Sequence, residues 1–213
     1  MGKPRSPNGR ARAVHERLKS EYEAICELDH DSPFELLVAT ILSAQCTDAR
    51  VNKTTPALFN RYPSPFELAA ADQMDLEKIV HPTGFYKSKA KNLLKMANQL
   101  LDDHEGVVPK ELAELVSLGG VGRKTANVIR SVAFGLPGLP VDTHVGRLAR
   151  RLGLTEEEDP VKVEMALNPM VPQYERGEFS LRVILHGRQV CFARNPQCDN
   201  CVLNDFCPAA FDF

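Results

Sequence analysis

Apolar residues recur along this sequence at steps of three and four, and proline or glycine marks the breaks between the stretches. Steps of three and four match the turn of an α-helix, whereas the strict alternation typical of β-strands is missing. The pattern therefore predicts an all-α protein. The expected helices span residues 34–44, 75–80, 88–101, 111–118, 123–133, 143–152, 161–167 and 180–191, of which 34–44 is apolar nearly all round and is expected to be buried.

Two similar segments mark helix starts. Ser32-Pro33-Phe34-Glu35 and Ser64-Pro65-Phe66-Glu67 each place serine at the N-cap, proline at the first helical position and glutamate at the third. Serine and glutamate at this spacing can bond each other's backbone N–H groups, which forms a capping box. We therefore expect a helix to begin at each proline.

At the start of the chain, we expect residues 1–12 to be mobile.

Composition narrows the class of protein. The chain has 213 residues, of which 43% are hydrophobic, and this is enough for a substantial core. Its net charge of −2 provides no overall basic field, so a nucleic-acid site has to come from the basic clusters at residues 3–19 and 123–151. No apolar run approaches the roughly 20 residues that span a membrane, and no signal peptide is apparent. We expect a cytoplasmic protein with no membrane partner.

The segment LGGVGRKT at residues 118–125 joins two predicted helices through three glycines. Gly120 and Gly122 allow unusual φ angles, and without side chains they let backbone N–H groups approach a DNA phosphate. The same glycines also fit a tight turn with no further role. The hairpin therefore favours phosphate contact without establishing it.

Lys124 lies at the margin of the apolar face predicted for residues 123–133, so we expect a semi-buried amine. Partial desolvation, the neighbouring Arg123 and the positive helix N-terminus all disfavour the ammonium and leave more of the neutral nucleophile. The alternative is an ordinary lysine at the edge of the apolar face, whose methylene groups pack on the helix while its amine reaches solvent. The helical geometry alone favours that alternative.

Asp142 follows the breaker-rich stretch 134–140 and precedes the helix predicted at 143–152. As the N-cap of that helix it would stay ionised, because helix N-terminal N–H groups stabilise a carboxylate. A carboxylate facing Lys124 can accept its proton or stabilise a developing sugar cation. Capping alone explains Asp142 and is compatible with catalysis.

Four of the six cysteines lie close together near the end of the chain, with spacing C-x6-C-x2-C-x5-C and no nearby histidine. In a reducing compartment such crowding favours a metal site over disulfides. Zinc sites of this kind usually show two C-x2-C pairs about 15 to 20 residues apart, so an iron-sulfur cluster is favoured over zinc. The cluster would also hold down the C-terminus. The four ligands are Cys191, Cys198, Cys201 and Cys207.

The hairpin, the segment VDTH at 141–144 and the four cysteines together resemble the endonuclease III family, the iron-sulfur branch of the helix-hairpin-helix DNA glycosylase superfamily. The match runs from about Ser32 to Cys207 and includes LSAQ at 42–45 and GFY at 84–86. The resemblance implies two domains with a DNA groove between them and a [4Fe-4S] cluster. The implied domains are a six-helix barrel at 26–136, with its helix-hairpin-helix at about 111–133, and a cluster domain formed by 1–25 and 137–213, with its four-cysteine loop at 191–207.

The resemblance also implies an activity. The chain would be a bifunctional DNA glycosylase and AP lyase that removes oxidised pyrimidines from double-stranded DNA, acts as a monomer and associates with the nucleoid. Lys124 would attack C1′, expel the base and form a Schiff base, and β-elimination, assisted by Asp142, would then break the strand. The remaining residues implied to contact DNA are Gly120, Gly122, Arg123, His144 and Arg194.

Enzymes of this kind flip the damaged nucleotide out of the duplex, and other side chains fill the gap. Gln45 and Phe85 match those positions by resemblance. Gln45 also fits a polar residue at a helix end, and Phe85 fits a core residue. Both alternatives remain open at the level of sequence.

The chain departs from the family pattern in three places. Gly119 replaces the usual proline of the hairpin, which could loosen it. Thr83 stands where a bulkier apolar wedge is common, and the loop 192–197 has fewer basic residues than expected. These differences leave Lys124 and Asp142 unchanged.

Two other functions fit parts of the sequence. A monofunctional adenine glycosylase shares the hairpin, the aspartate and the cluster, but that branch generally lacks the lysine and carries an extra C-terminal domain that we do not expect in 213 residues. A non-catalytic module could use the hairpin for DNA binding and the cluster for electron transfer. Lys124 favours the bifunctional enzyme over both.

Overall fold

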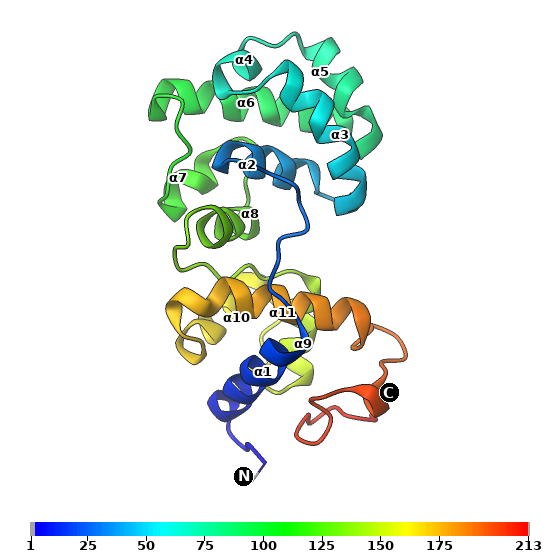
Figure 1. Cartoon of the computed structure of the whole chain (residues 1–213). Coiled ribbons are helices and arrows are strands. Elements are labelled where there is room, and N and C mark those ends of the chain that lie inside the picture. The colour runs from blue at the N-terminus through cyan, green and yellow to red at the C-terminus, as the bar shows by residue number, and fades with distance from the viewer. Residues whose placement is uncertain (1–2, 213) are drawn as a thin grey trace. The chain divides into compact units, whose positions relative to one another are not determined.

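The structure is a computed structural model that describes residues 3–212. The described chain contains helices and loops and no β-strand, which confirms the predicted all-α class (Figure 1). Its residues divide into two compact units, one of Cys26–Gly135 and one of Met1–Ile25 with Leu136–Phe213. Each unit has its own apolar core.

The unit of residues 26–135 is built around α2 (Pro33–Leu42), which the core encloses on nearly every side. Every residue of α2 from Leu36 to Leu42 is buried, as its apolar pattern predicts. The long α6 packs against α4 and α5 and also contacts α2. The other helices of this unit are α3 (Asp48–Arg61), α4 (Pro65–Ala69), α5 (Gln73–Val80), η1 (His81–Thr83), α6 (Tyr86–His104), α7 (Leu112–Ser117), α8 (Arg123–Val128) and η2 (Ile129–Ala133).

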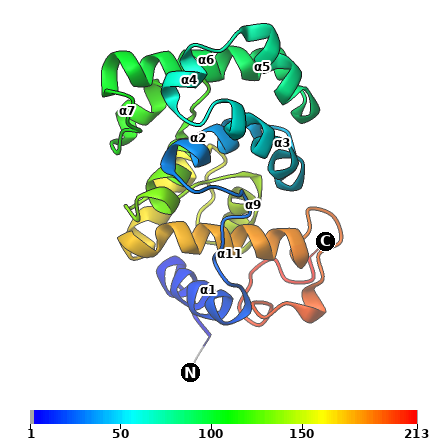
Figure 2. The ribbon, with the colours of Figure 1, turned by 45° about the horizontal axis from the view of Figure 1, so that its top comes forward.

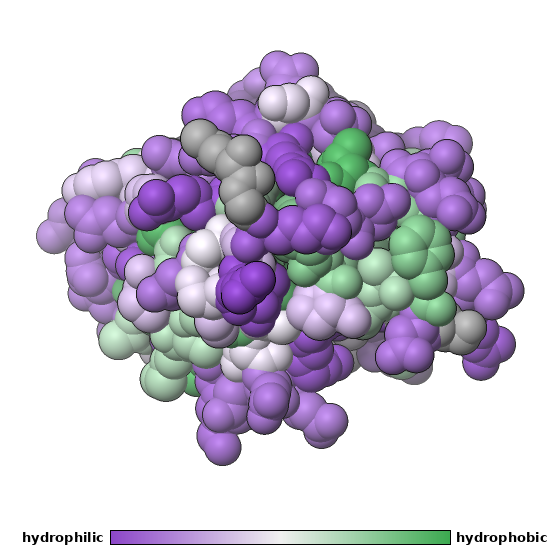
Figure 3. All heavy atoms as spheres, turned by 90° about the horizontal axis from the view of Figure 1, so that it is seen from below, coloured by the Kyte–Doolittle hydropathy of each residue, from purple (hydrophilic) through white to green (hydrophobic). Residues whose placement is uncertain are grey.

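The other unit is built around α11 (Arg176–Gln189), which packs against both α1 and α9 (Figure 2). Leu18, Leu148 and Phe179 belong to its buried core. No helix in the described part of the chain is long and apolar enough to cross a membrane. One face of the molecule is largely hydrophilic, with apolar areas between the polar side chains (Figure 3). The remaining helices of this unit are α1 (Pro7–Glu21), α9 (Thr143–Arg151), α10 (Pro160–Leu167), η3 (Asn168–Met170), η4 (Gln173–Glu175) and η5 (Cys198–Asn200).

Helix α1 corrects the expectation that residues 1–12 are mobile. Ser6 caps it by accepting a hydrogen bond from the Gly9 N–H at 3.1 Å. The guanidinium of Arg10 donates to the Gly153 carbonyl at 2.5 Å, which holds the helix start against a distant loop. Residues 1 and 2 lie outside the described residues.

Helix α3 is absent from the sequence prediction because its buried face is partly polar. Thr54 and Thr55 are buried there, and Pro56 interrupts the helix pattern. The Thr54 hydroxyl donates to the Arg50 carbonyl one turn earlier at 3.0 Å, which satisfies the buried hydroxyl within the helix. A search for apolar periodicity therefore does not find α3.

Both serine-proline segments start helices as predicted, although neither forms the full capping box. Ser32 accepts a hydrogen bond from the Glu35 N–H at 3.1 Å, but the Glu35 carboxylate accepts from the Asp31 N–H at 2.6 Å. Ser64 accepts from the Phe66 N–H at 3.2 Å and donates its hydroxyl proton to the Glu67 carboxylate. The serine cap is thus present without the reciprocal bond from glutamate to the N-cap N–H.

The hairpin between α7 and α8 lies so close to α6 that Gly119 has no room for a side chain. A Cβ at this position would lie 2.8 Å from the Asn92 carbonyl oxygen and 2.9 Å from the Lys95 Cβ. The amide of Gln99 also holds the hairpin, since its Oε1 accepts from the Gly119 N–H at 2.8 Å and its Nε2 donates to the Ser117 carbonyl at 3.0 Å. In the folded state the hairpin is therefore anchored at Gly119, where the sequence suggested loosening.

Replacing Gly119 by alanine tests this contact. We expect Gly119→Ala to lower the free energy of unfolding by about 1 to 3 kcal/mol, because the added methyl meets the α6 backbone. The control is Gly122→Ala, since a Cβ there would meet nothing within 4 Å and its φ of −89° suits any residue. Urea unfolding measures both variants. Equal stability of the two would contradict the close contact.

Candidate functional site

Lys124 lies in the first turn of α8, directly after the hairpin, and it is exposed. The expectation of a semi-buried amine is therefore wrong. The buried residues of this helix are Ala126 and Asn127, whereas the side chain of Lys124 is exposed. Within its unit the amine is accessible to an incoming ligand.

The two candidate glycines of the hairpin differ in what they require. Gly120 has a φ of +76°, which favours glycine, and a Cβ there would lie 2.9 Å from the Asn92 Cβ. Gly122 has an ordinary φ and open space around it. A tight turn thus explains Gly120 but not Gly122, whose missing side chain leaves the backbone before Lys124 uncovered. Arg123, which lies between Gly122 and Lys124, is half-buried.

Asp142 is the N-cap of α9, as predicted. Its Oδ1 accepts hydrogen bonds from the His144 N–H at 2.8 Å and the Val145 N–H at 2.9 Å. The Ser180 hydroxyl of α11 donates to the Pro140 carbonyl and so fixes the segment that leads to Asp142. Lys124 and Asp142 belong to different units, and their pairing remains a prediction.

His144 lies half-buried where α9 meets α11. A Cβ at Gly187 would lie 2.8 Å from the His144 Nδ1, so glycine is what lets the two helices approach. Burial is the main cause that lowers the pKa of His144. The positive charge of the nearby Arg147 lowers this pKa further, whereas the negative charge of Asp142 raises it. The imidazole therefore helps to pack the helix that Asp142 caps, whatever contact with DNA it makes.

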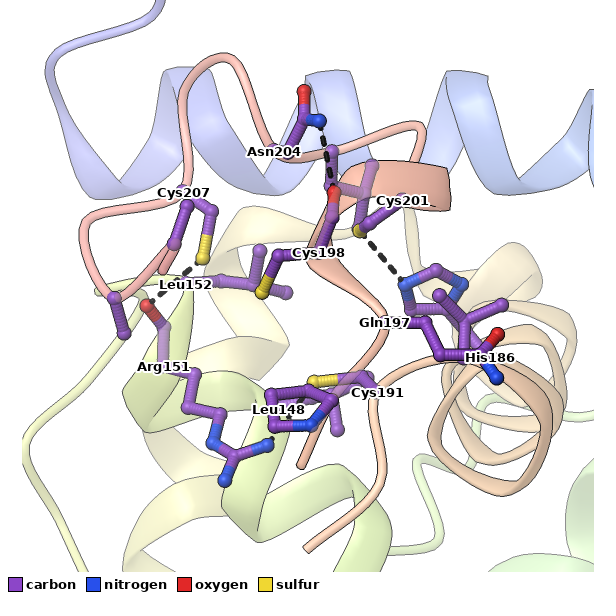
Figure 4. A pocket seen from close by; sticks show the side chains of 15 residues that line it. Leu148, Arg151, Leu152, His186, Cys191, Gln197, Cys198, Cys201, Asn204 and Cys207 are labelled. Atoms are coloured by element: carbon purple, nitrogen blue, oxygen red, sulfur yellow. Dashed lines mark hydrogen bonds between the residues drawn. The ribbon is translucent and has the colours of Figure 1, made fainter. Parts of the chain in front are cut away.

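The four cysteines of the C-terminal run are half-buried and line one cavity. Figure 4 shows their sulfur atoms turned toward a shared space, next to Leu148 and Leu152. Burial raises the pKa of Cys201 to about 11 and also raises the pKa of Cys207. Buried thiols become thiolates when a bound cation supplies the compensating charge, and four of them around one cavity suit an iron-sulfur cluster. Among the described residues, these side chains do not lie close enough together to form a ready-made site for a single metal ion.

A histidine that sequence reasoning missed lies beside this cavity. The His186 Nε2 lies 3.3 Å from the Cys201 Sγ, and its Nδ1 lies 3.0 Å from the Tyr22 hydroxyl oxygen. Burial lowers the pKa of His186 to about 4, so the ring is neutral near pH 7. A neutral ring that accepts from Tyr22 can donate its Nε2 proton to a thiolate of Cys201. His186 lies just outside the cysteine run, in α11, and its spacing carries no signal.

Several arginines of the two basic clusters hold the cysteine loop. Arg151 donates to the Phe192 carbonyl at 2.7 Å and to the Ala193 carbonyl at 2.9 Å. Arg147 donates to the Cys191 carbonyl at 2.9 Å, and Arg17 of α1 donates to the Val202 carbonyl at 2.6 Å. These side chains are therefore structural, although their clustering in the sequence suggested nucleic-acid binding. Arg194, in the same loop, is exposed.

Gln45 and Phe85 are both exposed, and both have the left-handed backbone conformation, with φ of 53° and 47°. Phe85 is 66% exposed, so the alternative that it belongs to the core is wrong. Thr83 is buried, and its hydroxyl donates to the Val80 carbonyl at 2.8 Å, so its side chain is not available as a wedge. Gln45 follows the end of α2, as its helix-end alternative also requires.

Comparisons with protein families match most of the chain. Residues 38–173 match the HhH-GPD superfamily of base excision DNA repair proteins, and residues 191–207 match the iron-sulfur binding domain of endonuclease III. The endonuclease III of Synechocystis is 49% identical, over 99% of this chain and 97% of the relative. The endonuclease III of Escherichia coli is 41% identical, over 85% of this chain and 86% of the relative. The loop 191–207 is thus an iron-sulfur binding segment.

Solved structures agree with these matches. A structure of a trapped endonuclease III–DNA covalent intermediate has a TM-score of 0.90 and 42% identity, over 95% of this chain and 96% of that chain. A thermostable thymine-DNA glycosylase has a TM-score of 0.86 with 20% identity, over 97% of this chain and 99% of that chain. The second likeness concerns the fold alone, and the predicted helix-hairpin-helix glycosylase fold is confirmed.

The bonds of Asp142 predict how its substitutions affect stability. Asp142→Ala removes the acceptor for two N–H groups of α9, so we expect the free energy of unfolding to fall by about 0.5 to 2 kcal/mol. Asp142→Asn keeps a capping oxygen and is expected to lose only a small part of this. Chemical unfolding of both variants measures the difference. A loss as large for Asn as for Ala would show that the cap does not act as described.

Proposed function

The chain belongs to the endonuclease III family of HhH-GPD base excision DNA repair proteins, and from this premise we propose that Lys124 is the nucleophile of a bifunctional DNA glycosylase and AP lyase. The proposed substrates are oxidised pyrimidines and abasic sites in double-stranded DNA. The observation that supports the proposal most is the exposed Lys124, two residues after Gly122, where the hairpin backbone is uncovered. A monofunctional adenine glycosylase and a non-catalytic module are not favoured.

The proposed reaction proceeds through a covalent enzyme–DNA intermediate. The neutral Nζ of Lys124 attacks C1′ of the sugar, and the bond from C1′ to the base breaks with its electron pair on the base. The attached amine loses a proton, and its lone pair then breaks the bond from C1′ to the ring oxygen O4′. This opens the sugar ring, places a proton on O4′ and leaves a Schiff base between Nζ and C1′. Removal of a C2′ proton then expels the 3′ phosphate oxygen, and water releases the enzyme from the sugar.

Asp142 is proposed to serve this reaction through its charge. Its carboxylate accepts hydrogen bonds from two N–H groups at the start of α9. An ionised carboxylate can accept the proton that Lys124 loses or stabilise the cationic sugar that forms as the base leaves. Capping and catalysis therefore use the same property of Asp142.

The remaining candidate residues are proposed to hold the DNA. The hairpin at Gly120 and Gly122 offers backbone N–H groups to a phosphate, and Arg123 adds a cationic side chain. Gln45 and Phe85, both exposed, are proposed to fill the space left by the extruded nucleotide. Arg194 and His144 are proposed as further contacts. We also propose that the protein acts as a monomer and associates with the nucleoid.

The cluster is proposed to be of the [4Fe-4S] type, held by Cys191, Cys198, Cys201 and Cys207. Four thiolates without a histidine ligand are the usual ligand set of such a cluster. When bound, the group would supply a redox-capable cross-link between the segments that its cysteines come from. The protein would provide the cavity around the cluster, the neutral His186 beside Cys201, and the arginines that hold the cysteine loop.

Borohydride trapping tests the role of Lys124. We expect wild-type protein to form a covalent adduct with a duplex that contains an abasic site, because borohydride reduces the Schiff base. Lys124→Ala is expected to lower trapping by a factor on the order of 10³ or more. Lys91→Ala, which removes another exposed lysine of the same unit, is the matched control and is expected to trap normally. Bound DNA without an adduct in wild-type protein would refute the lyase assignment.

Iron and sulfide analysis tests the cluster type. We expect about four irons and four sulfides per chain, together with visible absorbance of a [4Fe-4S] cluster. Cys198→Ser is expected to lower the iron content. Cys26→Ser, outside the cysteine loop, is expected to leave it unchanged. A colourless protein with one zinc ion per chain would overturn the assignment.

A further inference from the structure

Lys89, near the start of α6, is a buried lysine that the proposed chemistry does not use. Only 4% of its surface is exposed. Its Nζ donates to the Leu42 carbonyl at 2.8 Å and to the Thr83 carbonyl at 2.7 Å. Burial lowers its pKa, since an ammonium loses hydration in the interior. An apolar side chain would fill this place without that cost, so the two hydrogen bonds need an explanation of their own.

Both acceptors are carbonyls at helix ends. Leu42 is the last residue of α2, and Thr83 is the last residue of η1. Carbonyls in the last turn of a helix lack donors within it and carry partial negative charge, which attracts a cation. An ammonium has three N–H donors and can serve both ends at once. Lys89 therefore joins two segments that are far apart in the sequence.

Each of these segments leads directly to one of the residues proposed to fill the DNA gap. Gln45 comes three residues after Leu42, and Phe85 comes two residues after Thr83. Both have positive φ angles, which are uncommon outside glycine and persist only where the surroundings hold them. The Lys89 backbone N–H also donates to the Phe85 carbonyl at 3.0 Å. Lys89 thus contacts the supports of both exposed side chains.

We propose that Lys89 is a positioning residue for DNA recognition, whose buried ammonium holds the two loops so that Gln45 and Phe85 act on the duplex as a pair. The inference rests on the proposed function, because that function assigns the two side chains to the gap left by an extruded nucleotide. Lys89 touches no DNA. It acts only through the Leu42 and Thr83 carbonyls.

The test uses full-length protein and a duplex with a tetrahydrofuran abasic-site analogue next to 2-aminopurine, whose fluorescence rises when it unstacks. Lys89→Met keeps the length of the side chain and removes its donors. We expect this variant to bind undamaged duplex about as wild type does. Its preference for the analogue, taken as the ratio of the two affinities, is expected to fall about tenfold, and most of the fluorescence rise is expected to disappear. Retained preference and fluorescence would overturn the proposal.

Two comparisons separate positioning from general stability. Leu100→Ala opens a cavity in the core along the same helix without touching either loop, and it is expected to keep the fluorescence rise. In a Gln45→Ala, Phe85→Ala background, Lys89→Met is expected to change the preference by less than about twofold, since nothing remains to be positioned. A full additional loss in that background would assign Lys89 a purely structural role. If Lys89→Met does not unfold cooperatively, Lys89→Gln takes its place in the same assays.

Wild-type trapping distinguishes failure of this inference from failure of the proposed function. If wild-type protein forms the borohydride adduct while Lys89→Met keeps its preference, only the role of Lys89 is refuted. If wild-type protein forms no adduct, the proposed function fails first. Lys89→Arg, which keeps cationic donors, is expected to recover part of the preference, and an effect equal to that of methionine would contradict a role for the donors.

Discussion

The close approach of the hairpin backbone to α6 is the contact on which the candidate active site depends. It requires glycine at position 119, because the Asn92 carbonyl and the Met96 N–H occupy the space of a side chain. The Gln99 amide holds the same hairpin by two hydrogen bonds, one donated to the Ser117 carbonyl and one accepted from the Gly119 N–H. Since α8 begins directly after this hairpin, the contact sets where Lys124 stands within its unit. No cap from a side chain holds the start of α8, so the hairpin itself has to do so.

Helix α6 serves more than this one contact. Its later turns carry Gln99, which holds the hairpin by hydrogen bonds, and Asn92, against which the hairpin backbone packs. Lys89, near its start, holds the segments before Gln45 and Phe85. One helix therefore supports both the proposed nucleophile and the proposed gap-filling side chains. In the other unit, α9 also has two roles. Asp142 caps the start of α9, and Arg147 and Arg151, in its later turns, hold the cysteine loop.

Periodicity, caps and cysteine spacing predicted much of this arrangement. Most helices and the cap at Asp142 follow from local rules that the sequence displays directly. The exposure of Lys124 was not predicted, because contacts formed on folding decide which residues of α8 are covered, and these are Ala126 and Asn127. Helix α3 was missed because threonines occupy its buried side.

Long-range polar contacts were beyond the reach of the sequence. Lys89, Gln99 and His186 carry no motif, and each acquires its meaning from a partner brought close by folding. The basic clusters illustrate the same limit, since the charges in the sequence do not show which arginines will donate to carbonyls of the cysteine loop. The resemblance to a known family assigned the reaction, whereas the structure identified the supports of the residues that would carry it out.

Peptide mapping of the borohydride-reduced protein–DNA complex tests the central claim most directly. After proteolysis and nuclease digestion, mass spectrometry locates the lysine that carries the reduced sugar. The account predicts the modification on Lys124. A modification on another lysine, or on the N-terminal amine, in place of Lys124 would contradict it.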